Sequence, residues 1–122
     1  MSRGKILVVD DDLDILEVLG IILEGEGFQV ELMENGKNIY ERIASFNPNL
    51  IILDVMLGNM DGREICNSIK STKETQDIPV IMISATHNLD QFIKKNCNPD
   101  DFLEKPFDFV NLIHKVELKL IA

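Results

Sequence analysis

The sequence predicts an α/β domain in which one parallel β-sheet lies between two layers of helices. Short apolar runs alternate along the chain with longer segments whose apolar residues recur at helical spacing. The apolar runs are nearly continuous, which is typical of strands buried on both faces of a parallel sheet. Two of these runs, Ile6–Val9 and Leu50–Leu53, are followed directly by the acidic residues Asp10 and Asp54. An α/β domain with carboxylates at one edge of its sheet accounts for this pattern.

Five strands are expected, each a short apolar run bordered by turn residues. Glycine, asparagine or proline stands in every run or no more than two residues from it, as is typical of turns and strand ends. In chain order, the expected strands are Lys5–Asp10, Phe28–Met33, Leu50–Asp54, Ile78–Ser84 and Asp101–Glu104.

Five helices are expected after these strands, because apolar residues there repeat every three or four positions. In chain order, the expected helices are Asp12–Glu24, Lys37–Ser45, Arg63–Lys70, Leu89–Lys95 and Asp108–Lys119. Gly25 and Gly27 end the first helix. The turn signal Asn35-Gly36 precedes the second helix, and Pro48 follows its end.

Strands that alternate with helices form right-handed crossovers, which leaves few sheet topologies. The commonest arrangement of five such units is a flavodoxin-like (βα)5 three-layer sandwich with strand order 2-1-3-4-5. Ligands bind such a sheet beyond the carboxyl ends of its strands, at the switch point between strands 1 and 3. Those two strands end at Asp10 and Asp54, so the fold and the chemistry indicate the same edge.

Length and composition fit one domain with a core of its own. The chain has 122 residues, of which 45% are hydrophobic and 27% charged. No apolar stretch approaches the roughly 20 residues that span a bilayer, and no signal-peptide pattern is present, so we expect a cytoplasmic domain without membrane contact. The net charge of −9 argues against nucleic acid as a partner of this domain. Cys66 and Cys97 lack metal-ligand spacing and are expected to be reduced thiols.

Polar side chains suited to chemistry stand at the ends of four expected strands. Asp10 and Asp11 lie at the end of the first strand, and Asp54 ends the third. Ser84 ends the fourth strand, and Lys105 follows the fifth. Clustered carboxylates repel one another, so a hard cation such as Mg2+ is expected among them. A metal, a nucleophilic carboxylate, a hydroxyl and an ammonium around one cavity meet the needs of phosphoryl transfer to an aspartate.

These residues stand in motifs that resemble the receiver domain of two-component response regulators, of the chemotaxis-regulator type. The resemblance runs from about Lys5 to the C-terminus. The matching stretches are Ile6–Asp12, Leu53–Leu57, Met60–Gly62, Ser84-Ala85 and Asp100–Phe107. Five motifs in the same order and at consistent spacing make the resemblance specific, although each motif alone is weak.

The resemblance implies a role for each of these residues. Asp54 would accept a phosphoryl group from a phosphohistidine of a sensor histidine kinase or a histidine phosphotransfer protein. The implied Mg2+ ligands are Asp10, Asp11, Asp54 and the backbone carbonyl of Met56. Ser84 and Lys105 would hold the phosphoryl group, and Ser84 and Phe102 would move together as the switch. Asp12, one place beyond the usual acidic pair, is expected to cap the first helix.

Three departures from the family pattern are visible. Gly58 stands where the family usually has proline, which predicts a more mobile loop. Asn98-Pro99 replaces the usual Gly-Ala, and the stretch from Ser84 to Lys105 is about one residue short. Met56 and Thr86 offer no carboxylate or amide that could orient an attacking water. We therefore expect slow loss of the phosphoryl group from the acceptor.

The leading hypothesis is a single receiver domain over residues 1–122, whole or excised from a longer response regulator or hybrid kinase. It would act as a switch on a downstream output domain or protein, not as a turnover enzyme. One alternative is a Mg2+-dependent phosphatase or phosphotransferase with an aspartyl-phosphate intermediate. Such enzymes use an Asp-x-Asp pair, but two places after Asp54 stands Met56, which cannot transfer a proton. Asp10 and Asp12 formally satisfy the pair, but the chain lacks room for a substrate cap. Another alternative is a docking scaffold that needs no phosphorylation, against which the complete acidic set argues.

The last expected helix carries more apolar residues than one helix face can bury. They are Phe109, Val110, Leu112, Ile113, Val116, Leu118, Leu120 and Ile121. Two explanations stay open. Either the chain is cut from a longer polypeptide, or this helix contacts a partner or a second copy of the chain. A homodimer would form through the face of the fourth helix, fifth strand and fifth helix.

Overall fold

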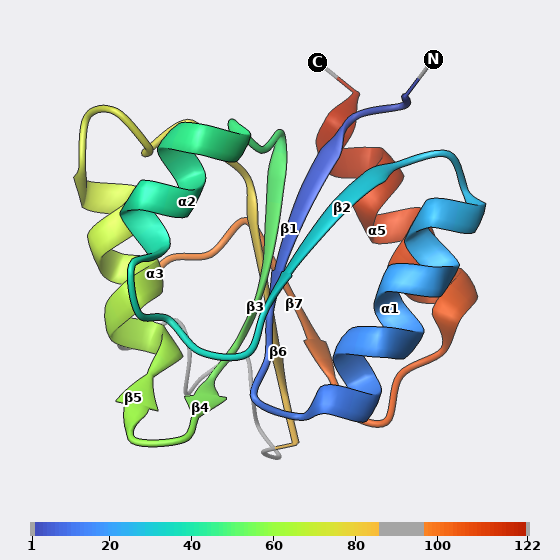
Figure 1. Ribbon diagram of the computed structural model, residues 1–122, viewed down its shortest axis with the longest axis horizontal. Coiled ribbons are helices and arrows are strands. Elements are labelled where there is room, and N and C mark those ends of the chain that lie inside the picture. Colours follow the sequence, from blue (N-terminus) through green and yellow to red (C-terminus); the bar gives the residue numbers. More distant parts are fainter. Residues whose placement is uncertain (1, 86–96, 122) are drawn as a thin grey trace.

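A computed structural model describes residues 2–85 and 97–121 as a parallel five-stranded sheet with helices on both faces (Figure 1). Its strands are β1 (Lys5–Val9), β2 (Gln29–Met33), β3 (Leu50–Asp54), β6 (Val80–Ser84) and β7 (Asp101–Glu104). They pair in the order β2-β1-β3-β6-β7, all in parallel. Counted along this sheet alone, that order is 2-1-3-4-5, so the predicted flavodoxin-like topology is confirmed.

The helices form two layers around this sheet. Helices α1 (Leu13–Gly25) and α5 (Phe109–Leu120) cover one face, and α2 (Ile39–Phe46) and α3 (Gly62–Ser71) cover the other (Figure 1). The helix expected at Leu89–Lys95 lies outside the described residues, as does Thr86. Both chain ends lie together at the edge opposite the carboxyl ends of the strands (Figure 1). Among residues 2–85 and 97–121, no helix has the length and apolar character that a membrane crossing requires.

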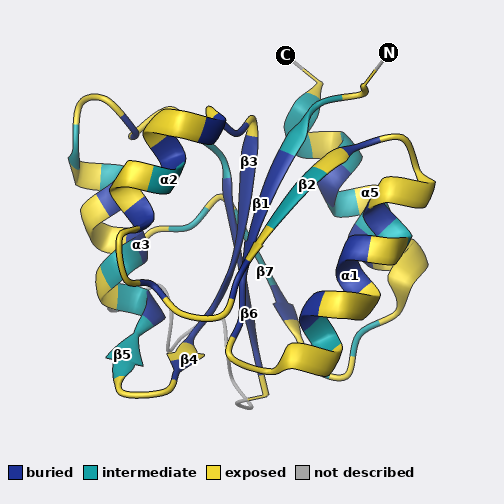
Figure 2. Ribbon diagram, viewed as in Figure 1, coloured by how far each residue is buried: buried dark blue, intermediate teal, exposed yellow. Residues whose placement is uncertain are grey.

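The sheet buries apolar side chains toward both helical layers, and its central strands β1, β3 and β6 are dark along most of their length in Figure 2. Along β1, Leu7 and Val9 pack on the α2–α3 side, whereas Ile6 and Val8 pack on the α1–α5 side. This alternation follows from the two-residue period of a strand. Full burial of each such side chain contributes roughly 1.5–3 kcal/mol, so the central strands form a rigid base for the residues at their ends.

Most element boundaries lie within two residues of those expected, and local chemistry explains the shifts. Asp12 caps α1 as predicted, because its carboxylate accepts hydrogen bonds from the N–H groups of Asp14 and Ile15. Helix α2 begins at Ile39, two residues later than predicted, because Asn38 has a left-handed φ of 62°. A residue in that conformation cannot belong to a right-handed helix.

A two-stranded hairpin between β3 and α3 was not predicted. Strands β4 (Met56–Leu57) and β5 (Met60–Asp61) pair in antiparallel fashion within the segment expected to be a loop. Gly58 lies in their connection with a φ of +63°, where a side chain would be strained. The hairpin continues β3 past the edge of the main sheet, beside the acidic residues.

Helix α5 confirms the predicted excess of apolar surface. Leu112 and Val116 are buried in the core. The exposed apolar residues of this region are Phe109, Val110, Leu118 and Ile121.

Candidate functional site

Asp10 anchors the site at the carboxyl end of β1. Its backbone N–H donates to the carbonyl of Met33 at 3.1 Å, which continues the β1–β2 pairing by one step. The side chain is fully buried, and Oδ1 accepts the N–H of Asp12 at 2.9 Å. Oδ2 is also buried and forms an ion pair with Lys105 without a well-directed hydrogen bond. One oxygen of Asp10 is therefore used by the backbone, and the other points into the site.

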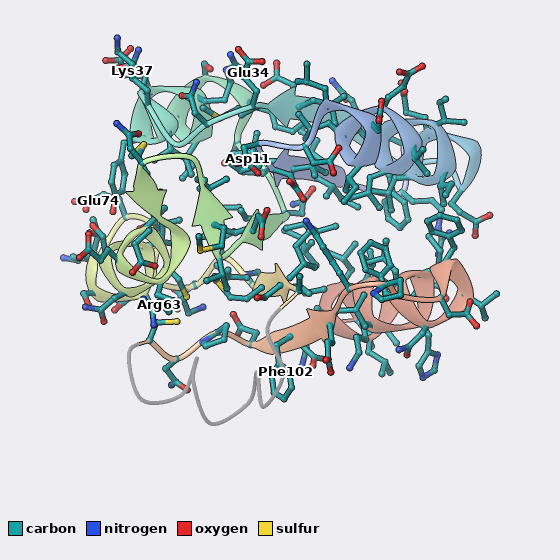
Figure 3. The ribbon with its side chains drawn as sticks, turned by 90° about the horizontal axis from the view of Figure 1, so that it is seen from below. Asp11, Glu34, Lys37, Arg63, Glu74 and Phe102 are labelled. Carbon is teal, nitrogen blue, oxygen red and sulfur yellow. The ribbon has the colours of Figure 1, made fainter. Side chains whose placement is uncertain are left out.

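Asp11 lies beside Asp10 but is exposed, between the start of α1 and the β4–β5 hairpin (Figure 3). Its Oδ2 accepts a hydrogen bond from the N–H of Gly58 at 3.0 Å. Proline has no N–H, so the residue that the family usually carries at this position could not make this bond. Gly58 thus has a local function here, since it holds the exposed carboxylate over the site.

Asp54 ends β3 and is 3% exposed. Its Oδ1 accepts the N–H of Met56 at 3.3 Å, and its Oδ2 lies 3.3 Å from the Nζ of Lys105. Gly62 packs directly on the backbone carbonyl of Asp54, where a Cβ atom would clash. The N–H of Gly62 also donates to the carbonyl of Val55 at 2.7 Å. These contacts tie the start of α3 to the end of β3 and hold Asp54 in place.

Lys105 brings a positive charge to the two buried carboxylates. Its Nζ lies 3.0 Å from Oδ2 of Asp10 and 3.3 Å from Oδ2 of Asp54. Its backbone N–H donates to the carbonyl of Ser84 at 2.7 Å, which positions the lysine at the end of β7. Burial alone would lower the pKa of Lys105, but the contacts and charges of Asp10 and Asp54 raise it above its ordinary value. Lys105 therefore stays charged.

Burial, together with the neighbouring Asp10, makes Asp54 a weaker acid than an ordinary aspartate. Burial is the main cause that raises the pKa of Asp54 from 3.8 to about 7, and the hydrogen bond and negative charge of Asp10 raise it further. Lys105 and the N–H of Met56 lower it, but by less. Near neutral pH, a proton therefore competes with any cation for this carboxylate.

The acidic residues fit a small, hard divalent cation. One carboxylate oxygen from each of Asp10, Asp11 and Asp54 lies within 4.8 Å of the other two. Three such oxygens from two strand ends match the preference of Mg2+ for carboxylate ligands. The buried Oδ2 of Asp10 supports this fit, because it accepts no hydrogen bond and its ion pair with Lys105 leaves room for a second positive partner.

Ser84 and Phe102 lie on the strands that were expected to carry them, whereas Met56 lies on the unpredicted strand β4. Ser84 is buried at the end of β6 and pairs in register with Glu104. Phe102 lies on β7, partly buried against the core on the α2–α3 side, at the margin of the molecule far from Asp11 (Figure 3). The side chain of Met56 is 64% exposed. Sequence reasoning gave no role to the N–H of Gly58 or to the close packing of Gly62.

A family model described as the response regulator receiver domain matches residues 6–117. The DNA-binding response regulator MtrA of Mycolicibacterium paratuberculosis is 33% identical over 119 residues, which are 97% of this chain and 52% of the relative. The chain thus spans about half the length of the curated relatives it matches.

Solved structures of receiver domains have the same fold as this chain. The signal receiver domain of a signal transduction histidine kinase from Syntrophus aciditrophicus has a TM-score of 0.88 and 34% identity, covering 97% of this chain and 90% of that one. A response regulator receiver domain protein from Methanospirillum hungatei has a TM-score of 0.86 and 30% identity, covering 98% and 94%. Both likenesses extend over nearly the whole of the chain.

Proposed function

The chain belongs to the response regulator receiver domain family, and from that premise we propose that Asp54 is its phosphoacceptor. The observation that carries this assignment is the buried Asp54 carboxylate at the switch point of the sheet, with Lys105 at 3.3 Å and two further aspartates around it. Receiver domains act in two-component signalling. The donor would be a phosphohistidine of a sensor histidine kinase or a histidine phosphotransfer protein.

In the proposed reaction, an oxygen of Asp54 attacks phosphorus in line, and the phosphorus–nitrogen bond to the donor histidine breaks. The bond electrons return to the imidazole, which takes up a proton. Lys105 already lies beside Asp54 and would pair with the phosphoryl oxygens. The hydroxyl of Ser84, at the end of the neighbouring strand, would donate a hydrogen bond to them.

Asp10, Asp11, Asp54 and the backbone carbonyl of Met56 would hold Mg2+, which when bound neutralises charge on the incoming phosphoryl group. The amide contacts described above would orient the acidic set for that purpose. The N–H groups of Asp12 and Gly58 fix the carboxylates of Asp10 and Asp11 respectively. The chain would thus assist its own phosphorylation and dephosphorylation without turning over a substrate.

The output would follow from movement of Ser84 and Phe102 toward the site and a shift between two conformations of the β7–α5 side. A downstream domain or protein, or a second copy on the face of the fourth helix, β7 and α5, would read that change. MtrA is a DNA-binding response regulator, whereas another relative is a receiver within a histidine kinase. We propose one cytoplasmic receiver domain that makes no contact of its own with nucleic acid or membrane, in either context.

The test is incubation of the purified chain with acetyl phosphate, with and without Mg2+, followed by intact mass measurement and peptide mapping. One phosphoryl group on Asp54 is expected, only with Mg2+, and none in Asp54→Ala. A matched control is Asp77→Ala, which removes an exposed carboxylate near the opposite edge of the sheet. Phosphate on another residue would refute the assignment. Steady release of phosphate from several phosphomonoesters would favour a phosphatase instead.

A further inference from the structure

Cys66 and Cys97 are distant in sequence but adjacent in the fold. Cys66 lies on α3 and is fully buried, and Cys97 precedes β7 and is 5% exposed. Both belong to the same hydrophobic cluster between the sheet and the α2–α3 layer. Both are free thiols, and they lie close enough for each to shift the pKa of the other. The phosphorylation chemistry uses neither of them.

The surroundings make the two sulfurs chemically different. The hydrogen bond to Cys97, followed by burial, raises the pKa of the Cys66 thiol above its ordinary value. Accepting that bond lowers the pKa of Cys97, against the effect of burial, and the positive charge of Arg63 lowers it further. Arg63 is held in place by Asp61, whose carboxylate accepts its Nε–H at 2.9 Å. Figure 3 shows Arg63 on the side of α3 that faces the chain entering β7.

We propose that Cys66 and Cys97 are a redox-sensitive pair that closes reversibly into an intramolecular disulfide when a peroxide is the oxidant. The Cys97 thiolate attacks the peroxide, whose oxygen–oxygen bond breaks, so that Cys97 becomes a sulfenic acid and, with hydrogen peroxide, water leaves. The Cys66 sulfur then attacks the sulfenic sulfur, its proton leaves with the hydroxyl as a second water, and the sulfur–sulfur bond forms. Two thiols and one hydrogen peroxide thus give one disulfide and two waters.

The proposed bond would add a covalent link where the fold already has a polar one. The Nζ of Lys70, on α3, donates to Oδ2 of Asp100 at 2.7 Å, and the same oxygen accepts the N–H of Val80 at 2.8 Å. Helix α3 is therefore already tied to the chain that enters β7. A disulfide at Cys97 would reinforce that tie and close the chain between the two cysteines into a loop. This consequence does not depend on the role assigned to Asp54.

The test uses the purified whole chain, reduced and freed of reductant, then exposed to hydrogen peroxide. We expect the intact mass to fall by two hydrogen atoms, and peptide mapping to join the peptides that contain Cys66 and Cys97. The midpoint of thermal unfolding should rise on oxidation, and dithiothreitol should reverse both changes. Gain of oxygen without loss of hydrogen, dimers joined by disulfides, or no reaction under conditions that oxidise a reference dithiol would overturn the proposal.

Single variants distinguish the two sulfurs. In Cys66→Ser, Cys97 should still be oxidised and should accumulate as a sulfenic acid that dimedone traps. In Cys97→Ser, Cys66 should react with peroxide much more slowly. If a serine variant unfolds in the reduced state, the corresponding alanine variant takes its place, because alanine buries no hydroxyl. Equal peroxide reactivity of the two single variants would overturn the assignment of Cys97 as the first sulfur oxidised.

Discussion

Asp54 illustrates the conflict between stability and function at a single residue. Its carboxylate is 3% exposed and lies beside Asp10, and its pKa in the folded state is about 7 against an ordinary value of 3.8. Because folding raises this pKa, ionised Asp54 opposes folding. Protonated Asp54 favours folding. Its contribution to the free energy of unfolding is fully present below the pKa of Asp54 in the unfolded state, and it is lost as pH rises through the pKa of Asp54 in the folded state. If Asp54 is the phosphoacceptor, as proposed, its buried carboxylate destabilises the domain in the pH range in which it would react.

Asp54→Asn should stabilise the metal-free domain at pH 8, because the amide removes the buried charge. The shift from 3.8 to about 7 corresponds to a gain on the order of 4 kcal/mol. The gain should shrink to well under half of that value at pH 5, where folded Asp54 is mostly protonated. Urea unfolding at both pH values measures it, with Asp77→Asn as the exposed control. Equal stability of the wild type and Asp54→Asn at pH 8 would contradict this account.

Met56 should determine how long the proposed phosphoryl group lasts. Its side chain is 64% exposed, and its backbone N–H donates to the Asp54 carboxylate, so a polar group there would stand near a phosphoryl group on Asp54. We expect the wild type to lose phosphate over many minutes, and Met56→Gln to lose it several times faster, because an amide can orient an attacking water. Time courses of intact mass after removal of acetyl phosphate measure both, with Met56→Leu as the apolar control. Decay of the wild type within seconds would count against this expectation.

At the scale of elements, the main strands and helices were predictable because burial on both faces leaves a simple pattern. The β4–β5 hairpin was not, since Met56–Leu57 and Met60–Asp61 are too short for any periodicity to appear. The acidic edge followed from strand order, because parallel strands bring Asp10 and Asp54 together. The Cys66–Cys97 contact could not be predicted, because it depends on how α3 packs beside the chain entering β7.

The hairpin gives Gly58 two separate functions that substitutions can distinguish. Its φ of +63° penalises any side chain, and its N–H holds Asp11 at 3.0 Å. Gly58→Ala keeps the N–H and meets no neighbour within 4 Å, so it should cost only about 1–2 kcal/mol of backbone strain, with Mg2+ affinity nearly unchanged.

Gly58→Pro removes the N–H and requires a φ near −65°, so it should destabilise the hairpin more and weaken Mg2+ binding. Urea unfolding and Mg2+ titration by calorimetry separate the two effects. Equal Mg2+ affinity of the alanine and proline variants would show that the hydrogen bond to Asp11 does not orient a ligand.

At the scale of the molecule, the sheet gathers acidic residues in a chain whose net charge is already −9. Mg2+ should therefore link folding, charge and pH. A cation that binds only the folded state stabilises it by about 2.7 kcal/mol at 100 times its dissociation constant. If the cation needs ionised Asp54, as proposed, its affinity should fall about tenfold for each pH unit below 7 and level off above that value.

Calorimetric titration in two buffers of different ionisation enthalpy counts the protons that Mg2+ releases. About one proton should leave near pH 6, and almost none at pH 9, since folded Asp54 is ionised there. Asp54→Asn should bind Mg2+ more weakly and release almost no proton at either pH. A separate thermal unfolding experiment controls for salt screening, which acts on all the exposed charges. NaCl at matched ionic strength should raise the midpoint of thermal unfolding much less than Mg2+ does. Binding at pH 6 without proton release would mean that Asp54 is not a ligand, and that the cation is held by other carboxylates.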